Sequence, residues 1–146
     1  MNCIIRLAEE RDIDALATLD KLCFTLPWDR SSFEFEIKEN LKAIYLVADY
    51  NGKIIGYAGI WVILDEGHIT NIAVHPDFRN RGLGTRLLSE LIELSERRGA
   101  KRHTLEVSVA NHSAISLYNK FGFETAGKRE KYYEDTNEDA LILWRL

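Results

Sequence analysis

The chain is poor in the features that mark several classes of protein. Its 146 residues include only two cysteines and two prolines, and no apolar run approaches the ~18 residues of a membrane-spanning helix. Cys3 and Cys23 stand in apolar surroundings without CxxC spacing, which indicates reduced, buried thiols. The N-terminus lacks the charged and then apolar segments of a secretory signal. We therefore expect a cytoplasmic protein that does not enter membranes.

Metal sites and nucleic-acid coating are also disfavoured. No metal site is expected, because the four histidines do not have the spacing of metal ligands and surface or capping roles suit them better: His68, His75, His103 and His112. The formal net charge of -4 argues against direct binding of nucleic acid. The length indicates a single domain, residues 1–146, which can bury roughly two-thirds of its unfolded surface.

Hydrophobic periodicity predicts an alternation of strands and helices. The expected elements are a strand over 3–8, helices over 9–24 and from Ser31 to about 41, a hairpin over 44–64, a strand over 68–74, a helix over 83–98, a strand over 102–109, a helix over 111–121, and strands over 123–132 and 140–146. Asn51-Gly52 marks the hairpin turn, and Ser31-x-x-Glu34 has the sequence pattern of a capping box. This order predicts a mixed, mostly antiparallel α/β sheet of about seven strands with about four helices on both faces. Strands 68–74 and 102–109 should be parallel, joined by a right-handed crossover.

A basic, glycine-rich loop connects the strand over 68–74 to the long helix. Arg79-Asn80-Arg81-Gly82-Leu83-Gly84 follows Ile72-Ala73-Val74 and opens that helix. Backbone N–H groups, permissive glycines and the positive end of the helix dipole favour a bound phosphate, and Arg79, Arg81 and Arg86 add full charge. The loop is neither a Walker loop nor a dinucleotide fingerprint. On the pattern alone, a tight turn with solvated arginines is an equal alternative.

Two further positions are candidates for chemistry. Glu106 stands between Leu105 and Val107 in a predicted central strand, where a carboxylate is costly unless it is partnered or solvated. The Glu106 carboxylate either faces a solvated edge of the sheet, pairs with an arginine, or serves as a general base. Tyr118 is most simply a core aromatic whose hydroxyl reaches the rim. Asn111 is by default the N-cap of the helix that carries Tyr118.

Taken together, these segments resemble the GNAT acetyltransferases from end to end. Within that superfamily the chain is similar to the bacterial RimI type, which acetylates the N-terminal alanine of a small-subunit ribosomal protein. The matching segments are Pro27-Trp28, residues 71–76, residues 79–84, residues 105–107, Asn111-x-x-Ala114-Ile115-x-Leu117-Tyr118, Gly122-Phe123 and Arg129-x-x-Tyr132-Tyr133. The chain departs from some relatives of this type at Glu134-Asp135, where a proline often follows the tyrosine pair.

The resemblance implies a site for acetyl-CoA. Its backbone and loop contacts would come from Ile72, Ala73, Val74, Arg79, Asn80, Arg81, Gly82, Leu83, Gly84, Thr85 and Asn111. The resemblance further implies Glu106 as the base, Tyr118 as the acid that protonates the departing thiolate, and a backbone N–H near Val74 that polarises the acetyl carbonyl. Trp28, Tyr132 and Tyr133 are candidates for the acceptor groove, with packing of loops onto the sheet as an equal alternative.

The acceptor follows from the resemblance and from one chemical argument. An α-amine has an ordinary pKa near ~7.7–8, whereas that of a lysine is near ~10.4, so an α-amine demands less of a single carboxylate. We therefore expect transfer of an acetyl group to a protein N-terminus, in a ribosomal protein. A small-molecule amine, a protein lysine and a non-catalytic CoA-binding module remain as alternatives.

Overall fold

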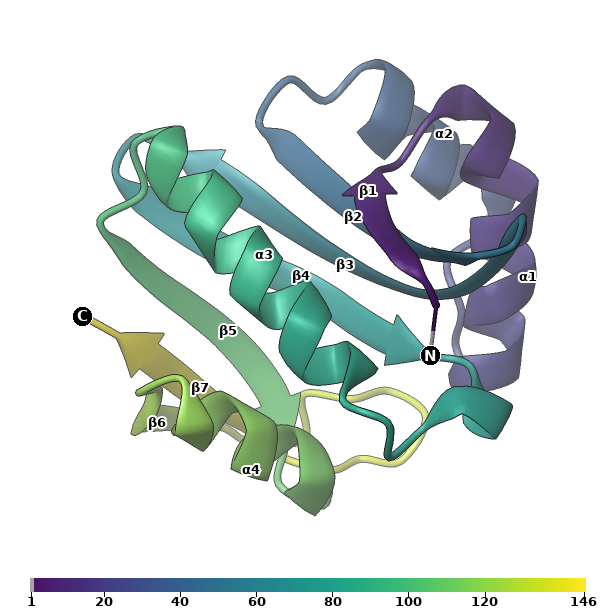
Figure 1. Cartoon of the computed structure of the whole chain (residues 1–146). Coiled ribbons are helices and arrows are strands. Elements are labelled where there is room, and N and C mark those ends of the chain that lie inside the picture. Colours follow the sequence, from purple (N-terminus) through teal and green to yellow (C-terminus); the bar gives the residue numbers. More distant parts are fainter. Residues whose placement is uncertain (1) are drawn as a thin grey trace.

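The computed structural model describes residues 2–146, and its centre is a seven-stranded sheet in the order β1-β2-β3-β4-β5-β7-β6 (Figure 1). The elements are β1 (Ile4–Leu7), η1 (Glu10–Asp12), α1 (Ile13–Cys23), α2 (Arg30–Lys38), β2 (Ala43–Tyr50), β3 (Lys53–Ile63), β4 (Glu66–Val74), η2 (Pro76–Phe78), α3 (Leu83–Arg97), β5 (Arg102–Ser108), α4 (His112–Lys120), β6 (Glu124–Arg129) and β7 (Ala140–Arg145). Among the strands of residues 2–146, only β4 and β5 pair in parallel. The predicted mixed, mostly antiparallel sheet is confirmed.

Helices cover both faces of this sheet, as predicted. In Figure 1, α3 and α4 lie on one face, and α1 and α2 lie on the other. The α3 side buries Leu88 and Leu91 against strand residues such as Leu105. On the opposite side, Leu16 and Phe33 belong to a second buried cluster. The helix predicted over 83–98 is confirmed as α3, and one stripe of it is buried: Leu83, Leu87, Leu88, Leu91, Ile92 and Ser95.

The β2–β3 hairpin turns at Asn51-Gly52, also as predicted. Asn51 has a φ of 53° and Gly52 a φ of 90°. Positive φ at both central residues is what a two-residue type I′ turn requires, and this turn follows the right-handed twist of the strands. Tyr50 therefore faces Lys53 across the hairpin. This local turn therefore sets the register in which β2 and β3 begin to pair.

Some element boundaries differ from the predicted ones. Asp29, and not Ser31, caps α2, because an Asp29 carboxylate oxygen accepts a hydrogen bond from the backbone N–H of Ser32 at 2.9 Å. The capping-box prediction is therefore wrong, and Glu34 instead pairs with Arg30 at 2.6 Å. α2 ends before its predicted limit, and β4 begins at residue 66. β6 ends at residue 129, so residues 130–139 form a loop.

β4 and β5 are in register over only three residues. Glu66–His68 pairs with Arg102–Thr104, and beyond these residues the two strands diverge (Figure 1). The other edge of β4 stays paired with β3 as far as Val74. Residues 69–74 therefore keep one free edge toward β5. Carboxyl ends of adjacent strands are where α/β sheets commonly bind ligands, and this opening lies there.

His103 is fully buried beneath α3, so a surface or capping role is wrong for this residue. Its Nε2 lies 2.8 Å from the Ser95 hydroxyl, which itself donates to the Ile92 carbonyl at 2.7 Å. Because Ser95 has used its hydrogen, Nε2 must carry a proton and donate to Ser95. Burial, and secondarily the Arg145 guanidinium, lower the pKa of His103.

We predict that acidification destabilises the fold through His103. An unfolded histidine titrates near ~6.5, and the folded pKa is lower, so acid favours the unfolded chain. The stabilisation is complete above about pH 6.5 and is lost as the pH falls below it. In urea denaturation at pH 7.5 and 5.5, His103→Gln should lose less unfolding free energy than the wild type. Equal losses in the two proteins would contradict this prediction.

Candidate active site

A groove of about 890 Å³ opens where β4 and β5 diverge. Its walls come from Ile69–Val74 of β4, Leu105–Ser108 of β5, the loop before α3, one face of α4 and the loop over 130–139. Most residues predicted for the site line it: Ile72, Ala73, Val74, Arg79, Asn80, Gly82, Leu83, Gly84, Thr85, Glu106, Asn111, Tyr118 and Tyr133. The fold thus gathers five segments of the chain around one opening.

The first turn of α3 presents backbone N–H groups to this groove. Gly82 is the N-cap, in the left-handed region with a φ of 80°, and no side chain caps this end. Within the described residues, the first N–H of the helix with a backbone acceptor is that of Arg86, bonded to the Gly82 carbonyl at 3.1 Å. The first turn also holds no acidic residue. A helix end with free N–H groups and no competing carboxylate is suited to a phosphate.

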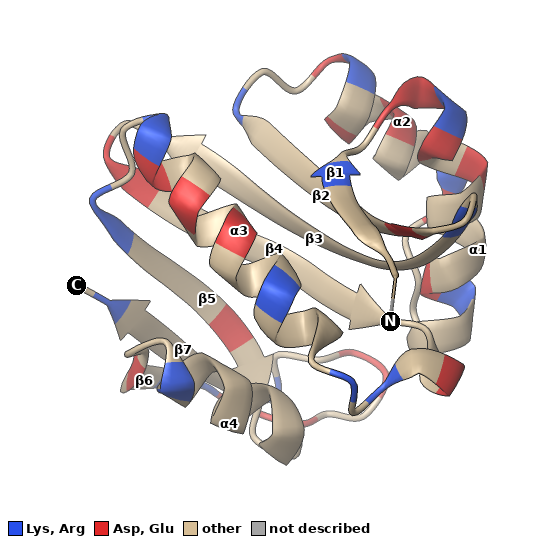
Figure 2. Ribbon diagram, viewed as in Figure 1, with Lys and Arg blue, Asp and Glu red and all other residues tan. Residues whose placement is uncertain are grey.

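The three arginines near this turn have different surroundings, although the loop before α3 is visibly basic (Figure 2). Arg79 lines the groove, and its Nε donates to the Val74 carbonyl at 3.0 Å. Arg81 lies over the Phe78 ring, 5.5 Å from its centroid, and is absent from the groove lining among residues 2–146. Arg86 instead donates to the Cys3 carbonyl at 3.2 Å. The sequence expectation that Arg86 supplies charge to a phosphate is therefore not met.

Glu106 and His68 project from the face of the sheet opposite α3. Leu105, Val107 and Ile69 belong to the α3-side core, and side chains alternate along a strand. Glu106 keeps 16% of its side chain exposed, and its Oε2 lies 2.8 Å from His68 Nε2. The sequence suggested water or an arginine as its partner, whereas the structure supplies a histidine. His68 keeps 38% of its side chain exposed, in agreement with the surface position expected for it, but its contact with Glu106 was not predicted, because only the strand register reveals it.

Tyr118 reaches the same groove from the α3 side. It is 7% exposed and packs edge-on against Phe123, with ring centroids 5.6 Å apart. Burial raises the pKa of Tyr118 far above its usual range, so its hydroxyl stays protonated. Among residues 2–146 no hydrogen bond engages this hydroxyl, although Tyr118 lines the groove. Asn111 caps α4 as predicted, accepting a hydrogen bond from the backbone N–H of Ala114 at 3.2 Å.

The loop over 130–139 closes one end of the groove. Tyr133, Asp135 and Glu138 line it, and the Thr25 hydroxyl, from the segment between α1 and α2, donates to Asp135. Burial is the main cause that raises the pKa of Tyr133 to about 12, and nearby acidic groups, Glu106 among them, add to it. This end of the groove is therefore acidic and is bordered by two loops.

Two other predicted acceptor residues lie outside the groove lining. Trp28 packs on Phe33, with ring centroids 5.5 Å apart, in the cluster beneath α1 and α2. Its backbone N–H donates to buried Asp20 at 2.8 Å. Tyr132 contacts the Arg129 guanidinium, 5.6 Å from its ring centroid, and is 42% exposed. Of the three aromatic candidates, only Tyr133 borders the groove.

A buried polar network supports β4 beside the groove. A register shift opposite Gly59 places Thr70 in a bulge, with Asn71 next to it. The Thr70 hydroxyl lies 3.1 Å from the Tyr45 hydroxyl, and the Asn71 amide donates to the Tyr57 hydroxyl. Tyr57 in turn donates to the α1 residue Asp20 at 2.5 Å. The network therefore ties the bulge of β4 to α1.

Gly59 leaves the space that this network needs. A Cβ at this position would lie 2.5 Å from Cζ of Tyr45 and 2.8 Å from the Thr70 hydroxyl oxygen. We predict that Gly59→Ala lowers the unfolding free energy by about 1–3 kcal/mol, the usual cost of overpacking. Gly127→Ala is the control, because its Cβ would lie 3.6 Å from the nearest atom, on Ile142. Equal stabilities of the two variants in urea denaturation would refute the close packing.

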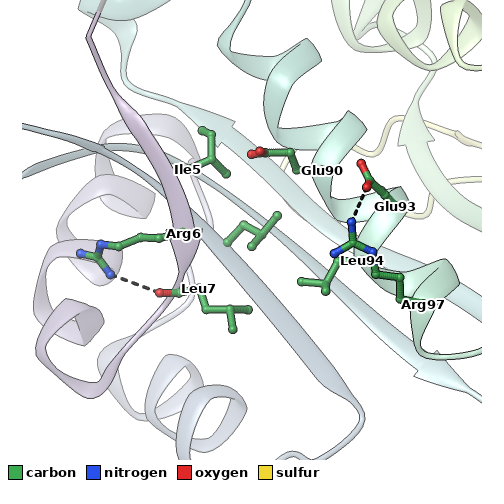
Figure 3. Close-up of a pocket in the computed structure, with 8 residues that line it drawn as sticks. Ile5, Arg6, Leu7, Glu90, Glu93, Leu94 and Arg97 are labelled. Atoms are coloured by element: carbon green, nitrogen blue, oxygen red, sulfur yellow. Dashed lines mark hydrogen bonds and ion pairs between the residues drawn. The ribbon is translucent and has the colours of Figure 1, made fainter.

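A second hollow of about 260 Å³ lies between β1 and α3 (Figure 3). Its lining contains none of the predicted site residues: Ile5, Arg6, Leu7, Leu46, Glu90, Glu93, Leu94 and Arg97. Arg97 pairs there with Glu93, and Arg6 donates to the Leu7 carbonyl at 3.2 Å.

No helix within residues 2–146 has the length and apolar character needed to cross a membrane. In the same described part of the chain, no three His, Cys, Asp or Glu side chains gather as they would around a metal ion.

Comparison with known proteins identifies the family of the chain that forms this groove. Residues 13–123 match the model of the acetyltransferase (GNAT) family. The chain belongs to this family. The GNAT chain is 44% identical over 140 residues to a Bacillus subtilis protein provisionally named a ribosomal protein bS18-alanine N-acetyltransferase, with 96% of this chain and 93% of the relative covered. It is 38% identical over 145 residues to the Escherichia coli K12 ribosomal protein bS18-alanine N-acetyltransferase, covering 98% and 96% of the two chains.

A solved structure agrees with these relatives. The crystal structure of the ribosomal-protein-S18-alanine N-acetyltransferase from Escherichia coli superimposes on this GNAT chain with a TM-score of 0.90 and 35% identity, over 99% of this chain and 93% of that one. The resemblance inferred from the sequence is thereby confirmed for the family and for the fold.

Proposed function

We propose that this protein transfers an acetyl group from acetyl-CoA to a protein N-terminus, and that the acceptor is the N-terminal alanine of ribosomal protein bS18. The observation that carries this proposal is the identity of 38% to 44%, over almost the whole chain, to proteins bearing that name. A reaction between acetyl-CoA and a ribosomal protein belongs in the cytoplasm, which agrees with the expectation from composition.

The polar groups that line the groove are suited to those of acetyl-CoA. The free N–H groups over 83–85 and the Arg79 guanidinium would hold the diphosphate, with the positive φ of 63° at Asn80 turning the loop toward it. The free edge of β4 at Ile72, Ala73 and Val74 would pair with the amide-bearing arm, as a peptide adds to a sheet edge. Asn111 would contact the same arm. The role of Arg81 would be limited to long-range charge, because its guanidinium lies over Phe78.

Glu106 and Tyr118 would act from opposite faces of the sheet. When bound, acetyl-CoA supplies an acetyl group activated as a thioester. Glu106 would take the proton of the attacking ammonium, and a backbone N–H near Val74 would polarise the carbonyl. The Tyr118 hydroxyl, kept protonated by burial and without a protein partner among residues 2–146, would protonate the departing sulfur. Base and acid would thus be separated by the reacting acetyl group.

The acceptor would enter where the loop over 130–139 meets the segment between α1 and α2. Tyr133 would contact it directly, whereas Trp28 and Tyr132 would support this entrance through their own packing. Asp135 and Glu138 give the entrance a negative charge, which attracts an ammonium terminus. An α-amine is partly neutral at pH 7, so Glu106 needs less basicity than a lysine acceptor would require.

We predict that the protein acetylates a peptide that begins Ala-Arg, used as a model of an acceptor with an N-terminal alanine. Incubation with acetyl-CoA should add one acetyl group to the α-amine, detected by intact mass and located by fragmentation. The control is the same peptide with a blocked N-terminus and a free internal lysine. Modification of that lysine alone, or of small amines alone, would contradict the proposed acceptor, and binding of CoA without any turnover would contradict the enzyme.

We also predict separate effects of the two reacting side chains. Glu106→Gln should lower kcat by roughly 10²–10⁴-fold, the usual contribution of a general base, and Tyr118→Phe should slow release of the thiol. Affinity for CoA should change little in Glu106→Gln, because the predicted diphosphate contacts lie in the loop before α3 and in the first turn of that helix. Glu124→Gln, on the edge strand β6, is the control for loss of one negative charge. Wild-type rates in both site variants would refute the assigned roles.

A further inference from the structure

His68, which the mechanism above does not use, lies directly behind Glu106. Its Nε2 is 2.8 Å from Glu106 Oε2, and both side chains project from the same face of neighbouring strands. His68 pairs in register with Thr104, the last residue of β5 before the strands diverge, two positions ahead of Glu106. Glu106 lines the groove, whereas His68 is absent from its lining. Glu106 is thus the groove residue to which the His68 side chain is hydrogen-bonded.

The remaining surroundings of His68 hold its ring in place. Trp61 of β3 is its register partner and packs edge-on against it, with ring centroids 6.2 Å apart. The Trp61 indole N–H donates at 2.5 Å to Glu36, which is itself 5% exposed. The Trp61 ring and the Glu106 carboxylate thus restrain the imidazole of His68 together. Because an ionised carboxylate only accepts hydrogen bonds, Nε2 is the protonated nitrogen of a neutral His68.

This contact occupies only one oxygen of Glu106. Among residues 2–146, His68 is the sole hydrogen-bond partner of the carboxylate, so Oε1 remains available. A general base works only within hydrogen-bond reach of the proton that it removes. A glutamate side chain has several rotatable bonds and would otherwise leave that position for part of the time. A second, fixed contact removes this freedom.

We propose that His68 is a positioning residue for acetyl transfer, donating from Nε2 to Oε2 of Glu106 so that Oε1 receives the proton of the acceptor ammonium. This inference rests on the proposed function. In the step itself, Glu106 takes one proton of the ammonium, the neutral amine forms the nitrogen–carbonyl bond, the carbon–sulfur bond breaks and Tyr118 protonates the sulfur. The second proton that the nitrogen loses as the amide forms restores the Tyr118 hydroxyl, and Glu106 releases its proton to solvent. His68 keeps its own proton throughout.

Three variants test the positioning role through kcat and KM. His68→Leu should lower kcat by about tenfold or more, as expected for the loss of a hydrogen bond to a charged group, with an unchanged KM for acetyl-CoA. His68→Gln offers an amide N–H in place of Nε2 and should recover most of that loss. Thr104→Val is the matched control on the register partner, because it removes only the bond to the Leu143 carbonyl and should keep the wild-type rate. A wild-type kcat in His68→Leu, or equal impairment in His68→Leu and His68→Gln, would overturn the proposal.

A spectroscopic measurement separates this inference from the proposed function. The Nε2–H proton of wild-type His68 at pH 8 should be observed downfield and exchange slowly with water, and Glu106→Ala should move this resonance upfield and speed its exchange. An unchanged Nε2–H resonance in Glu106→Ala would refute the pairing, whatever the activity of this variant. A wild-type protein with the expected Nε2–H resonance that acetylates no peptide N-terminus would instead refute the proposed function. An active wild type with a normal His68→Leu variant would refute this inference alone.

Discussion

The short parallel pairing of β4 with β5 is the constraint on which the candidate site depends. The two strands share register over Glu66–His68 and Arg102–Thr104 and then separate, although each stays paired on its other side. The separation leaves backbone groups of β4 without a strand partner in the middle of a sheet, where unpaired polar groups are costly. A ligand that supplies hydrogen bonds along this edge would offset that cost. The opening is thus a property of the sheet, and the loops around it add charge and shape.

Several features keep the two strands apart. The apolar stripe of α3 packs across β2, β3 and β4 and holds the N-terminus of α3 at the opening. On the opposite face, the Thr70–Asn71 bulge is tied through Tyr57 to Asp20 of α1. β7 pairs with β5 from His103 to Ser108 and so keeps β5 on the far side of the groove. Base and acid candidates then reach the groove from different faces, because Glu106 points away from α3 and Tyr118 belongs to the core beneath it.

Charge is distributed along the groove in a way that matches two different ligands. The α3 end combines free N–H groups with Arg79 and has no acid in the first helical turn, which suits a diphosphate. The other end carries Asp135 and Glu138 beside Glu106, which suits an ammonium group. A net charge of -4 for the chain conceals this separation, because composition averages over both ends. In the proposed function, this polarity would give the acetyl donor and the amine acceptor distinct places.

Local signals in the sequence determined much of the fold. The Asn51-Gly52 turn, the long helix α3, the Asn111 cap and the order of strands and helices were all predicted correctly, because each depends on residues close together in the chain. The glycine loop and its family resemblance also located the candidate site. Where Asp29 and Ser31 competed for one cap, the local pattern was ambiguous and the prediction failed. The contact of His68 with Glu106, the burial of His103 and the turn of Arg86 toward Cys3 were decided only by tertiary structure, since strand register and helix docking join residues that no local pattern relates.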